Sequence, residues 1–161
     1  MQKMRQFALA GVLAVGLAAC GSDEPGGGQG GAGDGEAPRY GYGAPPAAAT
    51  IETGDTDLGA IVTDADGLTL YMFGADKDGK STCYDDCAAT WPALVVEGEP
   101  EAGDGLDAQL GTTERTDGTS QVTYAGQPLY YFASDAAPGD TNGQGISDIW
   151  FVVSPEGKPI S

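Results

Sequence analysis

The heptapeptide LYMFGAD at residues 70–76 returns as LYYFASD at residues 129–135, and this repetition decides the fold. The offset between the two copies is 59 residues, and the same offset carries Trp91 onto Trp150. The repetition therefore extends well beyond one short motif. It predicts a domain built from two structurally related units.

Each copy of the heptapeptide has the pattern of an extended strand. Successive side chains of a strand point to opposite faces, so Tyr71 and Phe73 should face one side while Leu70 and Met72 face the other. The second copy should repeat that geometry. Each copy ends in an aspartate just past the strand, where a carboxylate can accept hydrogen bonds from turn amides.

The rest of the chain after residue 50 also has the pattern of a β protein. Short runs of period two are separated by Asp-Gly and similar turns, and no long apolar rhythm of period 3.6 is present. The predicted strands are residues 58–63, 68–73, 111–115, 121–124, 129–132 and 149–153. Residues 84–90 predict one or two helical turns, which Pro92 ends. The expected fold class is mainly β: a small antiparallel sandwich or barrel of two pseudo-repeats, with a short helical turn between residues 83 and 91.

Two interpretations of the repeated residues are open. The units could pack their aromatic strands across a shared core, because each aromatic side chain buries roughly 150–250 Å². Alternatively, the aromatic rings could line an exposed groove that stacks a ring or a sugar. The residues concerned are Tyr71, Phe73, Asp76, Trp91, Tyr130, Phe132, Asp135 and Trp150.

The repeated motif Tyr-x-Phe-x-x-Asp occurs with two further patterns. They are Cys83-x-x-x-Cys87-x-x-x-Trp91-Pro92 and the loop GDTNGQG at residues 139–145. Together these features resemble the bacterial secreted-repeat lipoproteins, a family defined by a Tyr-x-(Phe/Trp/Tyr)-x-x-Asp motif. The resemblance covers residues 55–157. It implies an extracytoplasmic location and a two-repeat architecture, and it supplies no catalytic residue, since the family's biochemical role is unsettled.

The N-terminus has the pattern of an export signal. Lys3 and Arg5 precede an apolar run over residues 7–19, which at about 13 residues is shorter than the ~20 needed to span a bilayer. The run ends in Leu-Ala-Ala-Cys, which resembles a lipobox and implies cleavage before Cys20 and lipid attachment to it. An ordinary signal peptide with a chance cysteine, or an uncleaved anchor, is the alternative.

These patterns predict three parts of the chain. Residues 1–19 would be the signal peptide, and residues 20–50, rich in Gly, Pro and Ala, would form a flexible tether behind the lipidated cysteine. Residues 51–161 would form the β-rich domain, with repeats over about 55–98 and 111–157.

Composition excludes several functions. The chain contains no histidine, which excludes Ser-His-Asp and Cys-His catalysis and His-ligated haem. Removal of Lys3 and Arg5 with the signal leaves five basic residues against 24 acidic ones, a net charge of −19. Such a domain is repelled by nucleic acid and by anionic lipid headgroups. Membrane attachment is therefore expected through acyl chains on Cys20, and we expect no cofactor and no nucleic-acid partner.

Cys83 and Cys87 admit three interpretations. A structural disulfide is typical of an exported domain, although a regular helix would hold residues i and i+4 too far apart, so the turn must be irregular or the bond strained. A thiol–disulfide or electron-relay couple is the second interpretation. A metal site completed by Asp85 or Asp86 is the third, and this would be an unusual zinc set.

Acidic turns at residues 64–67 and 76–79 contain too few ligands for an EF-hand and are expected to be Asp-Gly turns, with weak surface Ca²⁺ binding as the alternative. The sequence thus favours a non-enzymatic, lipid-anchored binding or scaffolding module of the cell envelope, whose partner is an unidentified envelope protein or small ligand. The alternative is an extracytoplasmic redox accessory protein that uses Cys83 and Cys87.

Overall fold

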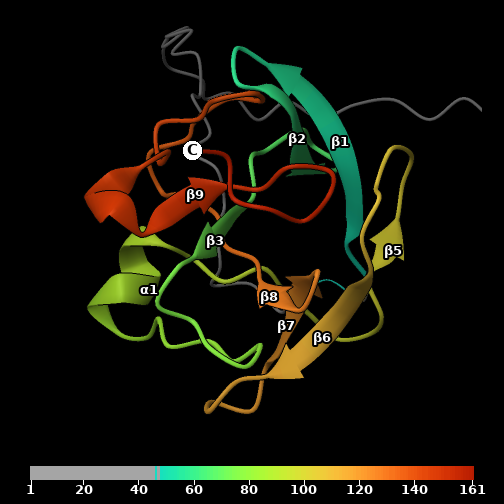
Figure 1. The fold of residues 1–161 in the computed structure, drawn as a ribbon. Coiled ribbons are helices and arrows are strands. Elements are labelled where there is room, and N and C mark those ends of the chain that lie inside the picture. Colours follow the sequence, from blue (N-terminus) through green and yellow to red (C-terminus); the bar gives the residue numbers. More distant parts are fainter. Residues whose placement is uncertain (1–45, 47) are drawn as a thin grey trace, which may run out of the picture. The chain divides into compact units, whose positions relative to one another are not determined.

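The computed structural model describes residues 46 and 48–161 (Figure 1). The predicted signal peptide, Cys20 and most of the predicted tether lie outside the described residues. In chain order the elements are β1 (Thr50–Thr56), β2 (Gly59–Asp64), β3 (Tyr71–Phe73), α1 (Asp86–Thr90), β4 (Val95–Val96), β5 (Glu101–Ala102), β6 (Leu110–Glu114), β7 (Ser120–Tyr124), β8 (Gln127–Pro128), the 3-10 helix η1 (Ile146–Asp148) and β9 (Trp150–Val152).

The strands form three small sheets. β1 pairs antiparallel with β2 and parallel with β5, β7 lies between β4 and β6 and also pairs with β8, and β3 pairs antiparallel with β9. In Figure 1, β3 and β9 lie between the β1–β2 hairpin and the β6–β7 hairpin. The predicted fold class is confirmed: the described part is mainly antiparallel β, with α1 in the expected segment, and its sheets do not close into a barrel.

The two units are interleaved. We call the chain from β1 to β4 repeat 1 and the chain from β6 to β9 repeat 2. The motif strand of repeat 1, β3, pairs with β9 of repeat 2. The motif segment of repeat 2 pairs with the end of repeat 1 through Tyr130 and Ala93, and the amide of Tyr131 donates to the carbonyl of Pro92 at 2.8 Å. Each repeat therefore supplies the strand that completes the other.

The alternation of the motif strand separates two hydrophobic clusters. Leu70 and Met72 pack in a cluster with Ile51 and Val122, whereas Tyr71 packs on the opposite side with Trp91. Phe73 is half-buried against that second cluster. This division is the one that the period-two pattern predicts.

One strand is missing from the prediction and one predicted strand is wrong. Residues 50–56 form β1, which the sequence does not predict because Gly54 and Asp55 are poor strand formers, and β1 pairs with β2. The predicted strand at residues 68–73 lies antiparallel to β2 through the bridge between Thr63 and Thr69, although only residues 71–73 form the regular element β3. The predicted strand at residues 129–132 is not regular: the element β8 ends at Pro128, and Tyr130 follows with isolated bridges to Tyr71 and to Ala93. Tertiary pairing overrides local propensity at both places.

The strands predicted at residues 111–115, 121–124 and 149–153 are present. β6 and β7 pair around the turn at residues 115–119, and β9 ends shortly before the turn at residues 154–157. Within the described chain, no helix has the length and apolar character that a membrane crossing requires.

Candidate functional site

The repeated tyrosines and aspartates bond to each other across the two repeats. The Tyr71 hydroxyl donates to Asp135 Oδ2 at 2.6 Å, and the Tyr130 hydroxyl donates to Asp76 Oδ2 at 2.6 Å. The backbones of the two tyrosines also exchange both of their hydrogen bonds, at 2.8 and 2.9 Å. All four residues are buried. The motif thus holds the repeats together by a pair of charge-assisted bonds.

Each motif aspartate also fixes the loop that follows it. Asp76 Oδ1 accepts from the amide and the hydroxyl of Thr82, both at 2.7 Å. Asp135 Oδ1 accepts from the amide and the side chain of Asn142, at 3.0 and 3.1 Å. The prediction that these carboxylates accept hydrogen bonds from turn amides is confirmed.

The aromatic residues form one continuous column through the second cluster. Trp91 and Trp150 stack with ring centroids 3.9 Å apart and planes 2° apart. Phe73 stacks on Trp150 at 4.1 Å, and Phe132 lies against Trp91 at 4.4 Å. Phe73 lies in repeat 1 and stacks on Trp150 of repeat 2. In the other pair, Phe132 lies in repeat 2 and Trp91 in repeat 1. The column therefore alternates between the repeats.

These motif residues lie in the interior and form part of the hydrophobic core. Tyr71 and Tyr130 are fully buried, and the two tryptophans are each 4% exposed. The Tyr71 ring lies edge-on to Trp91 and the Tyr130 ring edge-on to Trp150. An exposed aromatic groove between the repeats is not formed by the described residues.

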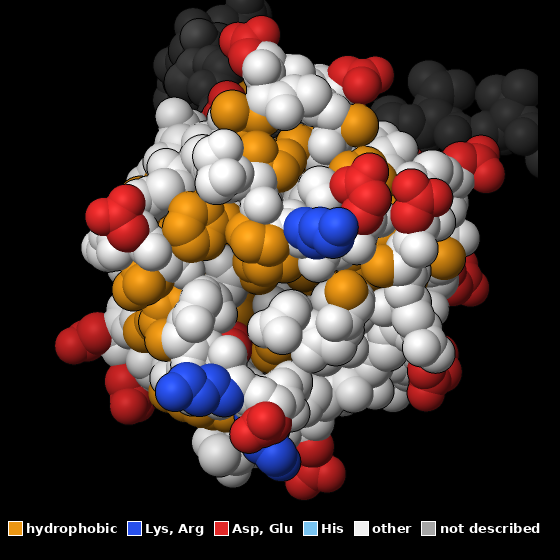
Figure 2. Space-filling view, viewed as in Figure 1, with side chains coloured by type: hydrophobic (Ala, Val, Ile, Leu, Met, Phe, Trp, Pro, Cys, Tyr) orange, Lys and Arg blue, Asp and Glu red, His pale blue; other side chains and the backbone are white. Residues whose placement is uncertain are grey.

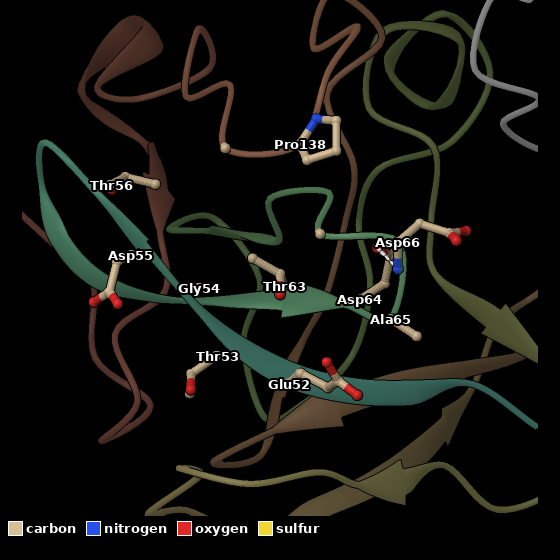
Figure 3. Close-up of a pocket in the computed structure, with 12 residues that line it drawn as sticks. Glu52, Thr53, Gly54, Asp55, Thr56, Thr63, Asp64, Ala65, Asp66 and Pro138 are labelled. Atoms are coloured by element: carbon tan, nitrogen blue, oxygen red, sulfur yellow. Dashed lines mark hydrogen bonds between the residues drawn. The ribbon is translucent and has the colours of Figure 1, made fainter.

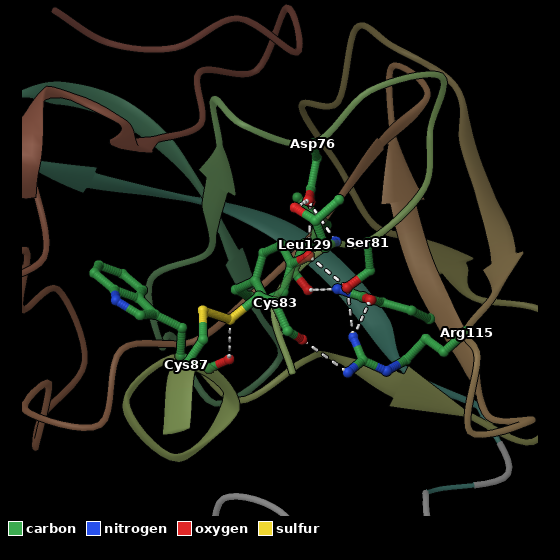
Figure 4. Close-up of a disulfide and its surroundings, with 10 residues drawn as sticks. Asp76, Ser81, Cys83, Cys87, Arg115 and Leu129 are labelled. Atoms are coloured by element: carbon green, nitrogen blue, oxygen red, sulfur yellow. Dashed lines mark hydrogen bonds between the residues drawn. A yellow bond between two sulfur atoms is a disulfide. The ribbon is translucent and has the colours of Figure 1, made fainter. Parts of the chain in front are cut away.

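The surroundings of Asp76 differ from those of Asp135 because they contain a buried arginine, Arg115. Arg115 Nη1 donates to Ser81 Oγ and to Gln121 Oε1, both at 2.7 Å, and Nη2 donates to the carbonyl of Cys83 at 3.0 Å. Ser81 Oγ in turn lies 2.8 Å from the Tyr130 hydroxyl that binds Asp76. Figure 4 shows Asp76, Ser81 and Arg115 linked in this network beside the disulfide. Arg115 thus supplies a positive charge to the network that contains Asp76.

The pKa values of buried groups follow from these surroundings. Burial raises the pKa of Asp135 above its ordinary value, although the hydrogen bonds from Tyr71 and Asn142 oppose this shift. Burial also raises the pKa of the Tyr71 hydroxyl, and the hydrogen bond to Asp135 adds to it. Among the described residues, no cation belongs to the hydrogen-bond network of Asp135, whereas Arg115 belongs to that of Asp76 through Ser81 and Tyr130. The negative charge of this carboxylate is therefore the less compensated of the two.

Cys83 and Cys87 form a disulfide, as predicted, with Cα atoms 5.3 Å apart. The turn that carries them is irregular: Asp85 has φ 51° and ψ −123°, and α1 begins only at Asp86. Cys83 is fully buried within the second cluster and Cys87 is half-buried against it. Asp85 and Asp86 are exposed, and among the described residues no cluster of three or more potential metal ligands is found.

An acidic groove with a volume of about 390 Å³ is lined by no motif residue. Figure 3 shows Glu52, Thr53 and Asp55 on β1, Asp64 at the end of β2 with Asp66 in the turn after it, and Pro138 on the facing loop. Asp64 is internally bonded, since Oδ1 accepts from the amides of Asp66 and Leu68 and Oδ2 from the Tyr131 hydroxyl. This turn is the predicted Asp-Gly turn.

The described surface is acidic around this groove and beyond it. On the face in Figure 2, Asp and Glu side chains are spread around the periphery, and few Lys or Arg side chains accompany them. Glu52, Asp55 and Asp66 line the groove and are exposed, and their carboxylates have no hydrogen-bond or ion-pair partner among the described residues. The groups that the groove presents to a ligand are therefore carboxylate oxygens.

Sequence reasoning missed two residues of the repeat interface. Arg115 is one of the chain's seven basic residues, and nothing in the local sequence pattern marks it as buried. Gly143 was noted only within its loop. A Cβ atom at Gly143 would lie 2.7 Å from Trp91 Cη2 and 2.8 Å from Tyr71 Cε1, so the loop closes over both rings only with glycine.

Comparison with known proteins agrees with this two-repeat geometry. No curated protein and no solved structure matches the chain significantly. The family described as a secreted repeat of unknown function, Lipoprotein_15, matches twice, over residues 52–95 and 111–154. The two matches coincide with the two interleaved units. The chain belongs to this secreted-repeat family, and its described part is an extracytoplasmic module built from two of the family's repeats.

Proposed function

We propose that the protein is a lipid-anchored module of the bacterial cell envelope that binds a positively charged ligand or partner in its acidic groove. The observation that carries the proposal is a difference in bonding between the polar groups of the motif and those of the groove. The motif carboxylates and hydroxyls are buried and bonded to one another. The carboxylates of the groove have no such internal partner, apart from that of Asp64.

The anchor rests on the sequence alone. The basic n-region, the short apolar run and the Leu-Ala-Ala-Cys ending support lipid attachment at Cys20. Metabolic labelling with an alkyne fatty acid tests it. The label should appear on the wild-type chain and be lost in Cys20→Ala, while label retained by the variant would contradict the anchor.

The carboxylates of the groove favour a positively charged ligand. Carboxylates around a concave surface raise the local concentration of cations, and the effect weakens with salt. The ligand class that fits is a basic peptide segment or a polyamine. An anionic ligand would meet repulsion from the whole domain.

Calorimetric titration with a tetralysine peptide tests the groove, at about 20 mM and about 200 mM salt. Asp55→Asn/Asp66→Asn should weaken binding about tenfold or more, since it removes two charges at the groove. Glu97→Gln/Glu99→Gln removes the same charge from exposed residues that do not line it, and this control should bind nearly as wild type. Equal weakening in both variants would show general charge attraction and overturn the groove as the site.

The disulfide supports a structural role better than the redox alternative. Reduction requires a thiol to attack one sulfur while the other leaves as a thiolate. Attack at the half-buried Cys87 would expel Cys83, which is fully buried in an apolar cluster that disfavours a thiolate. A redox partner would therefore meet a poor leaving group.

A further inference from the structure

The contact between the two repeats is nearly symmetric. The amide of Gly74 donates to the carbonyl of Ile149, and at the equivalent place the amide of Ala133 donates to the carbonyl of Thr90. The same correspondence relates the bond from Val153 to Leu70 and the bond from Leu94 to Leu129. Every one of these bonds joins repeat 1 to repeat 2. Neither repeat completes its own motif strand.

A repeat separated from the other would be left with unpaired groups. Asp76 is 7% and Asp135 is 2% exposed, and each accepts its tyrosine hydroxyl from the opposite repeat. Separation would also uncover the stacked faces of Trp91 and Trp150. Unpaired buried polar groups and exposed aromatic rings are both costly. An isolated repeat thus presents a surface that is specific for one kind of partner, the other repeat.

The chain between the repeats contributes little to this surface. Residues 97–109 connect β4 to β6 and contain Gly98, Gly103 and Gly105. The bonds between the two motif segments do not involve this connection, although the connection itself bonds to repeat 1 through the amide of Gly103 and to repeat 2 through the amides of Asp107 and Ala108. Opening it would therefore let the repeats separate while every contact that they make with each other could form again between two chains.

We propose that this surface also acts between molecules, and that its partner is a second copy of this chain, with repeat 1 of one copy seated on repeat 2 of the other. Within one chain the short connection holds the repeats at an effective concentration of roughly millimolar order, so the closed monomer dominates in dilute solution. Exchange dimers form where chains reach comparable concentrations. They contain two complete units, each built from two different chains.

Two cysteine variants test the exchange directly. Met72 and Phe151 are partners in the β3–β9 pair. Paired antiparallel residues have Cα atoms about 5.5 Å apart or less, which a disulfide can span. Met72→Cys and Phe151→Cys are placed in separate chains from Gly21 to Ser161, which are unfolded together in urea without reductant, refolded and oxidised. Peptide mapping then identifies any link between residues 72 and 151.

The linked fraction should rise from roughly one chain in a hundred at about 10 µM to about a quarter of the chains at about 1 mM, because only half of the exchange dimers in an equal mixture pair the two different variants. A mixture of Met72→Cys with Thr116→Cys is the matched control, because Thr116 is exposed on the β6–β7 turn and lies outside the pair. A single chain with both Met72→Cys and Phe151→Cys should close its disulfide as a monomer and so shows that the geometry permits the bond.

Two results would overturn exchange. The first is a double variant that closes in one chain while the separate variants stay unlinked at both concentrations. The second is an unmodified chain, refolded at the same concentrations, that sediments only as a monomer, and this result needs no cysteine variant. Neither result bears on the acidic groove, whose ligand is tested separately.

Discussion

Tyr71 and Tyr130 face each other across the two repeats, exchanging backbone hydrogen bonds at 2.8 and 2.9 Å while each hydroxyl binds the aspartate of the other's repeat. This arrangement explains why the motif needs both residue types at a fixed spacing. The strand brings the tyrosine backbone to its counterpart, and the aspartate past the strand end meets the opposite ring. The motif joins the two repeats, and its hydroxyls and carboxylates bond to one another inside the domain.

Removal of either motif hydroxyl should destabilise the fold. Tyr71→Phe leaves Asp135 Oδ2 buried without its donor, and the expected loss in the free energy of unfolding is about 1.5–3 kcal/mol. Tyr131→Phe removes a hydroxyl that donates to the half-buried Asp64, where water can replace it, so the expected loss is below about 1 kcal/mol. Urea denaturation measures both. Equal losses would mean that the bond to Asp135 carries no special weight.

A methyl group at Gly143 should be among the most harmful small changes in the described chain. The added Cβ of Gly143→Ala would overlap the rings of Trp91 and Tyr71, and overpacking of this kind costs about 1–3 kcal/mol or more. Gly111→Ala is the control: its nearest neighbour is the Thr123 hydroxyl at 3.2 Å, a side chain that can move. Thermal unfolding should show a clear drop for Gly143→Ala and little change for Gly111→Ala.

The sequence predicted the parts of the fold that depend on local pattern. The alternating residues around Tyr71 pack into two separate hydrophobic clusters, as the period-two pattern predicts. The Asp-Gly turn before Leu68 also forms as expected. It could not show that β3 pairs with β9, because a strand's partner depends on contacts between segments that are far apart. The swap of strands between repeats was invisible for the same reason. The strand β1 is absent from the prediction because Gly54 and Asp55, which are rare in strands, interrupt its run of threonines and isoleucine.

The candidate site was less predictable than the fold. The pairing of Cys83 with Cys87 follows from export and an even count of remaining cysteines. That Asp76 shares a network with Arg115 while Asp135 does not depends on where the β6–β7 hairpin places one side chain. No spacing in the sequence encodes that relationship.

Loss of the disulfide should weaken the domain without abolishing the fold. Closing so short a loop contributes only about 2 kcal/mol in the chain-entropy model, and the surrounding cluster remains in Cys83→Ser/Cys87→Ser. The bond should have a midpoint potential below about −300 mV, which is typical of structural disulfides. Alkylation and mass spectrometry across glutathione buffers measure it. A potential near −200 mV, with an intact reduced fold, would instead favour the redox function.

The backbone at Asp85 offers a stabilising change. Its φ of 51° with ψ of −123° lies in a region that glycine adopts far more easily than other residues. Asp85→Gly should therefore raise the free energy of unfolding by about 1 kcal/mol. Asp86→Gly, one residue later in the first turn of α1, should lower it by about 0.5–1 kcal/mol through helix propensity. Opposite signs for two neighbouring substitutions would be hard to explain by charge alone, whereas equal effects would contradict backbone strain at Asp85.

Stability should fall as the pH rises from about 4 toward neutrality. Burial raises the pKa of Asp135 and of Asp64 in the folded state, so between the unfolded and folded pKa values the folded chain holds more protons than the unfolded chain. Stability then decreases with pH across that window, and the contribution of the protonated carboxyls is fully present only below the unfolded pKa. Urea midpoints at about pH 4.5 and about pH 7.5 measure the difference.

Surface repulsion in so acidic a chain predicts the same direction, and salt separates the two causes. At about 1 M salt the screening length is only about 3 Å, which suppresses repulsion between exposed charges but not the burial of Asp135. A pH dependence that persists in high salt, and that becomes shallower in Asp135→Asn, assigns the effect to the buried carboxyl. If salt removes the dependence completely, the exposed acids are its cause and the raised pKa values of the buried ones have no measurable weight in folding.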